Sequence, residues 1–398
     1  MQTFACKESS GRRFFDVFFQ KIEKKMPNLK QRYFEVDRNR IIYSNAFRNL
    51  QHKNTTLNYY GDLNEGRNIF AKTASLGYLT RSLGSLLNVN ADLSEVIALT
   101  SGLAVPTFGN AGEIFAKELS NSQESFVSSF YAFKIVTQIE NLSIKHSGMN
   151  LSREVLESIL KCDNAFKTNK LPGYIVEYRD NFNLDLSSNA LLECQVFTVI
   201  RDFISVINDL EDALRFKLIS IKDFYESDSL IEYAQILLKK SSNLDNEYLI
   251  FEIGRILIHE FFEDVVFTTT QKISNLKIVT LDDVRNSDKK IVCISPKQLQ
   301  KLDKLKQFLI EKIHMTPKVI FVMKKLKRIL YKLYHLYKND LSLLPQKWQR
   351  MIQNHPDKQN QIVLDYILYM NDNFAIMQYK RFFNLESEEM NFLIQKLN

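Results

Sequence analysis

Glycine and proline are scarce in this chain, and this scarcity limits the possible folds more than any other feature. The 398 residues include 11 glycines and 7 prolines, whereas leucine, isoleucine, phenylalanine and lysine are abundant. Glycine and proline interrupt helices, so a sequence with few of them favours long helical segments. The chain is therefore predicted to be mostly helical, and its 45% apolar residues suffice for a sizeable core.

The cysteines and the apolar runs indicate a cytoplasmic protein. No two of the four cysteines, Cys6, Cys162, Cys194 and Cys293, are spaced as a CxxC pair. We therefore expect reduced thiols, as in a cytosolic protein. No apolar run approaches the length of a membrane span, so secretion and membrane contact are not expected. The net charge of +7 permits contact with phosphates without requiring it.

Apolar residues recur at helical spacing through most of the chain. The spacing predicts helices over residues 67–87, 190–215 and 246–267, and a helix that starts at Ser152. Residues 1–30 are predicted to form a peripheral helical segment. Residues 270–297 carry Asp, Asn, Ser and Pro, so they are the expected place for short strands and a domain boundary.

A later helix combines an apolar stripe with a basic face. The stripe includes Leu326, Leu330 and Leu333, and the basic side chains fall mostly elsewhere on the helix: Lys324, Lys325, Lys327, Arg328 and Lys332. A solvated surface face is the favoured interpretation of such a pattern. A footprint for single-stranded nucleic acid is the alternative.

Familiar catalytic motifs are missing from the sequence. It has no P-loop, no GxSxG and no GxGxxG. The segment "HEFFED" places His259 and Glu263 on one helix face, but it lacks the second histidine of a zinc-binding HExxH motif. The acidic run "NDLEDA" places Asp209 and Asp212 on one face as well. For both clusters, a solvated helix face is the favoured interpretation.

Several segments together resemble one known family, the HD-domain deoxynucleoside triphosphohydrolases. The similar blocks occur in the family's order over roughly residues 33–385: "DRNRIIYSNAFRNLQHK", "NLSREVLESILK", "INDLEDALRFKLIS", "LLPQKW" and "VLDYILYMNDNFAIMQYKRFF". The resemblance implies an all-α fold. It comprises an HD-type core over residues 31–268 and a helical C-terminal region over 269–398 that completes a nucleotide pocket.

The resemblance also implies that the family's metal site is degenerate here. The segment "ALTSGLAVPTFGNAGE" (98–113) aligns with the family's His-Asp dyad, which falls on Ser101 and Gly102. The earlier metal-binding His falls on Lys72, and the fourth ligand, an Asp, falls on Asp202. Further family positions are also changed, at Thr55, Ile69, Val105, Asn110 and Ser129. One carboxylate cannot hold a transition metal that commonly needs three or four protein ligands.

The expected function is therefore that of a catalytically inactive relative without a cofactor, acting as a regulatory or structural subunit. Its expected partner is a second copy or an active paralogue. Retained family positions are expected to bind a deoxynucleoside triphosphate: Arg48, Lys53, Asp365, Tyr366 and Asp372. We further predict that the Lys72 ammonium replaces the metal by pairing with Asp202.

Two alternatives to this function remain open from the sequence. In the first, the protein is an active triphosphohydrolase that uses Mg, Mn or Co and finds its catalytic groups elsewhere, at His259, Glu263 and Asp264. In the second, it is a module that binds single-stranded DNA.

Overall fold

The computed structural model describes residues 1–14, 33–61, 66–120, 126–144, 146–163, 167, 170–226 and 246–383. Throughout these residues the fold is all-α, as predicted, and its β-structure is limited to isolated bridges between Arg12 and Ser152 and between Asn141 and Gly148. None of the described helices is long and apolar enough to span a membrane. The predicted peripheral helix lies largely outside the described residues.

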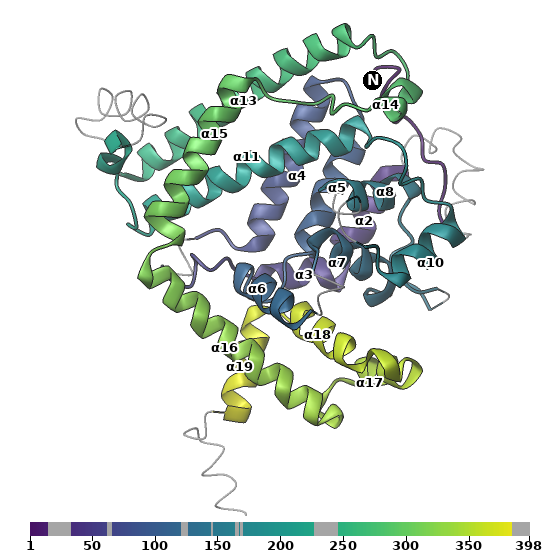
Figure 1. Ribbon diagram of the computed structural model, residues 1–398, viewed down its shortest axis with the longest axis vertical. Helices are drawn as coiled ribbons and strands as arrows, with labels where there is room; N and C mark the ends of the chain where they lie inside the picture. The colour runs from purple at the N-terminus through teal and green to yellow at the C-terminus, as the bar shows by residue number, and fades with distance from the viewer. Residues whose placement is uncertain are drawn as a thin grey trace, which may run out of the picture.

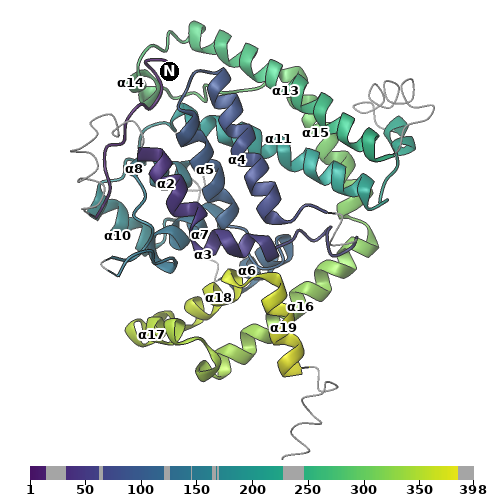
Figure 2. The same ribbon diagram turned by 180° about the vertical axis from the view of Figure 1, so that it is seen from behind.

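The helices pack around one another (Figures 1 and 2). Their bounds are α2 Tyr33–Ile42, α3 Asn45–Asn49, α4 Ile69–Leu86, α5 Ala91–Leu103, α6 Asn110–Leu119, α7 Ser128–Lys134, α8 Arg153–Lys161, α10 Gly173–Phe182, α11 Leu192–Arg215, α13 Asn246–Asn275, α14 Leu281–Asn286, α15 Pro296–Leu309, α16 Pro317–Asn339, α17 Gln346–Asn354, α18 Gln359–Tyr369 and α19 Asp372–Phe383.

The periodic segments form helices close to the predicted limits. The segments predicted over 67–87 and 190–215 correspond to α4 and α11, and Ser152 is the N-cap of α8. The third helix is longer than predicted, since α13 runs on to Asn275. Residues 270–297, a possible place for short strands, hold none: this segment contains the end of α13, the whole of α14 and the start of α15.

Two hydrophobic cores hold the helices together. The first joins α2, α5, α6, α7 and α8 to the C-terminal helices α16–α18, and the second joins α4 and α11 to α13 and α15. Helix α11 contributes to both, through Phe197 in the first core and Phe203 in the second. Figure 1 shows the C-terminal helices together at one end of the molecule and α13 with α15 at the other. Each core thus contains residues from both sides of residue 269.

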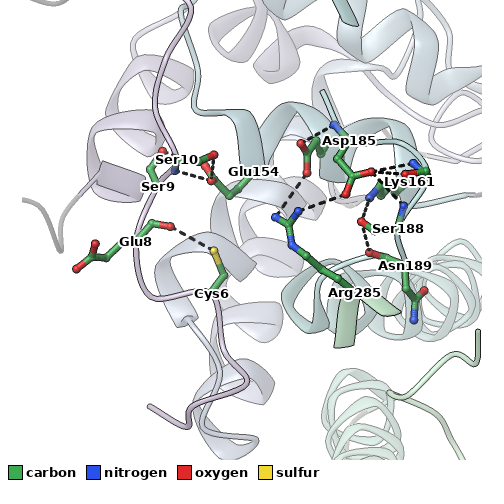
Figure 3. A network of polar contacts seen from close by, with 12 residues as sticks. Cys6, Glu8, Ser9, Ser10, Glu154, Lys161, Asp185, Ser188, Asn189 and Arg285 are labelled. Atoms are coloured by element: carbon green, nitrogen blue, oxygen red, sulfur yellow. Dashed lines mark hydrogen bonds and ion pairs between the residues drawn. The ribbon is translucent and has the colours of Figure 1, made fainter. Parts of the chain in front are cut away.

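The N-terminal residues run over the first core as an extended strap (Figure 3). The Glu154 carboxylate accepts hydrogen bonds from Ser9 Oγ at 2.9 Å and from the Ser10 backbone N–H at 2.6 Å. Further along the strap, the Glu193 carboxylate accepts from the backbone N–H groups of Cys6 and Asn90, each at 3.0 Å. Buried carboxylates of α8 and α11 therefore accept hydrogen bonds from backbone N–H groups of the strap, which has no regular secondary structure of its own.

A second polar cluster ties α14 to α8. Arg285 Nη1 lies 3.3 Å from Asp185 Oδ2, and Arg285 Nη2 lies 3.9 Å from Glu157 Oε2 (Figure 3). The backbone N–H of Asp185 also donates to Glu157 Oε1 at 2.9 Å. Arg285 is thereby fixed against the HD-type core by one charge-assisted hydrogen bond, to Asp185, and one ion pair, with Glu157.

Candidate functional site

A cavity of about 490 Å³ lies where α4, α5, α6, α7 and α11 meet. Three features of the sequence position its walls. Asn68 caps α4 by accepting from the Ala71 N–H at 2.9 Å, so Lys72 lies in the first turn of that helix. Asn90 caps α5 by accepting from the Leu93 N–H at 3.1 Å. A tight turn with positive φ at Phe108 and Gly109 leads into α6.

Positions that the family resemblance singles out converge on this cavity. They come from four separate stretches of the chain, and each contributes to the lining: Thr55, Ile69, Lys72, Ser101, Gly102, Val105, Asn110 and Ser129. The volume lies within the range of small-molecule sites in proteins. The cavity is therefore the candidate functional site.

Lys72 forms an ion pair in the cavity wall, but its partner is not the predicted one. Lys72 Nζ lies 2.6 Å from Asp212 Oδ2, and the two side chains are 12% and 4% exposed. The predicted pairing of Lys72 with Asp202 is wrong, because the Lys72 ammonium pairs with Asp212, ten positions further along α11. The expectation that the acidic run is solvated is also wrong for Glu211 and Asp212, which are both buried.

Asp202 is turned away from the cavity. Its carboxylate accepts from Arg201 Nε at 3.2 Å, and its side chain is 47% exposed. Arg201, by contrast, lines the cavity, where its Nη1 lies 3.9 Å from the sulfur of Cys162. This wall therefore presents a guanidinium to the cavity where the resemblance suggests a carboxylate.

The two positions of the His-Asp dyad are closed by local packing. Ser101 donates its hydroxyl hydrogen bond to the Ala98 carbonyl at 2.7 Å, one turn back in its own helix. A Cβ atom at Gly102 would lie 2.3 Å from Thr73 Oγ1 and 2.4 Å from Thr73 Cγ2. The space that an Asp side chain would need at position 102 is thus occupied by the Thr73 side chain of α4.

The residues of the cavity do not fit the metal that the family resemblance implies. Lys72 is paired with a carboxylate, Gly102 has no side chain, and Asp202 points elsewhere. No cluster of three or more His, Cys, Asp or Glu side chains arranged to hold a metal occurs in the part of the chain that the structure describes. Metal sites of this kind need several convergent ligands of those types.

Other polar side chains in the cavity are engaged with one another or buried. His314 Nε2 lies 3.3 Å from Asp209 Oδ2 at the cavity wall. Burial raises the pKa of the Cys162 thiol to about 12, so it is not a thiolate at neutral pH. Burial likewise raises the pKa of the Glu113 carboxyl, partly offset by Lys117.

The five residues expected to bind nucleotide do not line the cavity. Lys53 donates to the carbonyls of Val105 and Leu368, at 2.6 and 3.3 Å. The others also contact protein groups: Arg48 bonds Asn45, Asp365 pairs with Lys134, Tyr366 packs on Tyr337 and Trp348, and Asp372 accepts from Asn54 and Phe108. Through these contacts Lys53, Asp365 and Asp372 join the C-terminal helices to the HD-type core, whereas Arg48 bonds within α3 and Tyr366 packs among the C-terminal helices.

Asp372 and Lys53 hold the turn before α6. Asp372 accepts from the Phe108 N–H at 2.8 Å, the Asn54 N–H at 2.7 Å and the Tyr59 hydroxyl at 2.9 Å. Burial raises the pKa of Asp372 to about 6 and lowers the pKa of Lys53 to about 8. These two buried groups therefore fix the backbone that supplies Val105 and Gly109 to the cavity.

The "HEFFED" cluster lies on α13, outside the cavity. His259 Nδ1 and Glu263 Oε1 are 3.6 Å apart, and their side chains are 67% and 71% exposed. Asp264 accepts from the Ser295 N–H at 2.8 Å, at the N-cap of α15. On α16, the predicted basic face is partly used within the fold, because Lys327 pairs with Glu118 of α6 at 2.6 Å.

Sequence reasoning placed Asp209 on a solvated helix face, and it did not identify Arg201 or His314 as cavity residues. The available signal lies in α11, where Ile204 and Asn208 follow Arg201 at helical spacing and line the same cavity. No local pattern points to His314, which lies more than one hundred residues later, at the end of a π-helical turn over Ile310–His314.

Comparisons with known proteins find relatives of one description. A model of the phosphohydrolase-associated domain matches residues 292–381. The chain is 32% identical to a deoxyguanosinetriphosphate triphosphohydrolase-like protein of Rickettsia felis, over 92% of this chain and 95% of the relative. It is 33% identical to the protein with the same description from Rickettsia peacockii, over 91% of this chain and 94% of the relative. For that of Rickettsia bellii the identity is 32%, over 92% and 95%.

Proposed function

Since the chain belongs to the family of deoxyguanosinetriphosphate triphosphohydrolase-like proteins, we propose that it is a member that has lost hydrolysis and serves as a regulatory or structural subunit. The observation that carries the proposal is the Lys72–Asp212 ion pair in the wall of the cavity, beside Gly102. It supplies a fixed positive charge at the position where the family resemblance implies a metal ligand.

Electrostatics favours this ion pair over a bound metal. A divalent cation near Lys72 would meet a like charge, and Asp212 is already compensated by the ammonium at 2.6 Å. Activation of water on the triphosphate requires a metal-held or base-held nucleophile. The Ser101 hydroxyl is bonded to its own helix and supplies no such base.

The cavity retains features that suit a phosphate-bearing ligand without a metal. Arg201 lines it while pairing with Asp202 through Nε and Nη2, and guanidinium groups bind phosphate oxygens through paired hydrogen bonds. Thr55, Ser128 and Ser205 add hydroxyl groups to the lining. The proposed role is therefore to bind a deoxynucleoside triphosphate and to leave it intact.

A hydrolysis assay tests the loss of activity. The purified protein, supplied with each deoxynucleoside triphosphate and with Mg, Mn or Co, is expected to release no triphosphate. An Arg201→Ala variant, which truncates a side chain in the lining of the cavity, serves as the matched control, because a contaminating hydrolase would act equally in both preparations. Triphosphate release by the native chain that the variant abolishes would contradict the proposal.

A thermal-shift titration without metal tests nucleotide binding. A ligand that binds only the folded state raises the melting temperature as its concentration passes the dissociation constant. We expect a shift for the native chain that is lost in Arg201→Ala and kept in Arg179→Ala, whose arginine lies on α10 in an exposed ion pair with Asp180. No shift up to millimolar nucleotide would leave only the structural role.

A further inference from the structure

Helix α13 carries apolar residues on two opposite faces. One face is buried in the second core through Ile253, Leu257, Phe261 and Val265. On the other face, Phe251 is 67% exposed and Phe267 is 65% exposed. Aromatic side chains at such exposure on a core helix are typical of a contact with another protein surface.

The exposed face borders a groove of about 1300 Å³ between α13, α4 and α11. Tyr78 and Leu86 of α4 form its opposite rim, at 69% and 55% exposure. The groove follows α13 from Phe251 to Thr270, which is the shape that receives a helix. Figures 1 and 2 show α13 along the outer edge of the molecule, where a second protein has access.

The exposed face has a charge pattern that complements itself. Phe251, Arg255, His259, Glu263 and Phe267 are each exposed and recur at every fourth position, which makes them one ridge of the helix. Going outward from His259, the next ridge residue is an arginine in one direction and a glutamate in the other, followed by a phenylalanine in both. A ridge with this order fits a copy of itself that runs in the opposite direction.

We propose that two copies of this chain associate through α13, antiparallel and across a two-fold axis at His259. Ridges spaced by four residues pack into each other in the commonest class of helix–helix contact. In that arrangement Arg255 of each copy meets Glu263 of the other, and the Phe251 end of one helix covers the Phe267 end of its partner. A two-fold interface uses the same patch on both subunits, as this ridge does.

A partner in the groove would also contact part of the cavity wall, because Ile204 and Asn208 line both the cavity and the groove. The inference itself does not depend on the proposed function, since self-association through α13 requires neither bound nucleotide nor loss of hydrolysis. The experiment reads molecular mass only, so its failure and that of the proposed function are distinguishable.

Charge reversal tests the proposal by sedimentation velocity over a range of protein concentrations. The native chain is expected to dimerise. Arg255→Glu and Glu263→Arg each place like charges at both ends of the contact, and each is expected to weaken the dimer at least tenfold. Combining both substitutions in one chain restores opposite charges across the axis, and the dissociation constant should return to within about threefold of the native value.

A mixture of the two single variants supplies a second prediction. Each chain of one variant carries two glutamates at the contact, and each chain of the other carries two arginines. The mixture is therefore expected to form a mixed dimer at concentrations where each variant alone is largely monomeric. Arg179→Glu, on α10 away from the groove, is the matched control and should leave the native dimer unchanged. Circular dichroism of each variant verifies that it is folded.

Three outcomes would overturn the proposal. In the first, the native chain stays monomeric up to about 100 µM. Its dissociation constant would then be at least about a thousandfold above the sub-micromolar values of standard-size interfaces. Alternatively, a native oligomer is unaffected by either single reversal, which places its interface elsewhere. Finally, the doubly reversed chain remains as weakly associated as the single variants, which excludes direct pairing of Arg255 with Glu263.

Discussion

The Lys72 ion pair shows what the sequence can and cannot tell about single residues. The family resemblance places Lys72, Ser101 and Gly102 at one site, and all three line the cavity. It does not identify Asp212 as the partner of Lys72. Ten residues separate Asp202 from Asp212 on α11, and the choice between them depends on where α4 crosses that helix. Hydrophobic spacing predicts helices but leaves their crossing points undetermined.

Buried carboxylates are the residues for which the structure gives information that sequence patterns lack. Glu193 is fully buried in α11, where it accepts two backbone hydrogen bonds. Burial raises the pKa of its carboxyl from 4.5 to about 7, against the lowering effect of those bonds. The folded state therefore holds this proton more tightly than the unfolded chain does.

Stability should consequently fall as the pH rises through this range. The contribution of protonated Glu193 is fully present below about pH 4.5 and is lost by the time the pH passes about 7. The shift corresponds to about 3 kcal/mol. Glu193→Gln keeps an acceptor for Cys6 and Asn90 but cannot ionise, so its free energy of unfolding is expected to vary less with pH.

Urea denaturation of the native chain and Glu193→Gln at pH values from 5 to 8 measures this difference. The free energy of the native chain should fall relative to that of the variant as the pH rises. Glu177→Gln, an exposed position on α10, controls for the general effect of removing a carboxylate. If the native and Glu193→Gln curves run parallel over this range, Glu193 does not titrate as expected.

At the scale of elements, helix limits are well predicted where the apolar spacing is regular, and poorly where capping residues cluster. Residues 270–297 illustrate the failure. Their Asp, Thr, Ser and Pro residues mark helix starts: Thr280 and Asp283 form a capping box for α14, and Ser295 caps α15 with Pro296 behind it. The same residue types also occur at strand ends, so composition alone does not separate the two cases.

The contact between α4 and α5 depends on the missing side chain at Gly102. A methyl group there would lie 2.3 Å from Thr73 Oγ1 and 2.9 Å from Thr73 Cβ, which forces the two helices apart. We expect Gly102→Ala to lower the free energy of unfolding by about 1–3 kcal/mol. Thr73→Ala in the same chain removes the closest atoms, so the double variant should recover part of the loss.

Gly173→Ala is the matched control for this cycle, because nothing lies within 4 Å of the added methyl group at the start of α10. It should be neutral or slightly stabilising. Additive effects of Gly102→Ala and Thr73→Ala would show that the two positions do not compete for space. If they do compete, restoring Asp at position 102 and His at position 72 is not sufficient to rebuild a metal site.

For the whole molecule, the all-α class follows from composition. That the C-terminal helices share a hydrophobic core with the preceding helices does not follow from it. The predicted boundary at residue 269 rests on local punctuation of the sequence. In the structure, Leu330, Leu333 and Val363 of the C-terminal helices belong to the same core as Phe115 and Leu156. Contacts between residues so distant in sequence leave no local pattern, and only the family resemblance indicated that the C-terminal region closes over the HD-type core.

This shared core predicts cooperative unfolding of the two regions. Trp348, the sole tryptophan, is 4% exposed in α17 and packs against Tyr366 and Tyr369, so its fluorescence reports the C-terminal helices alone. Far-ultraviolet circular dichroism reports all helices. Because α16–α18 complete the first core, the two signals should change at the same denaturant concentration.

A variant of Asp372 tests whether its hydrogen bonds to Asn54 and Phe108 couple the unfolding of the two regions. Asp372→Ala leaves the buried N–H groups of Asn54 and Phe108 without their acceptor, which should cost about 2–4 kcal/mol. Both midpoints are expected to move together to lower denaturant, whereas Asp357→Ala, at an exposed position, should move neither. A fluorescence transition that precedes the circular dichroism transition would mean that the C-terminal helices detach first.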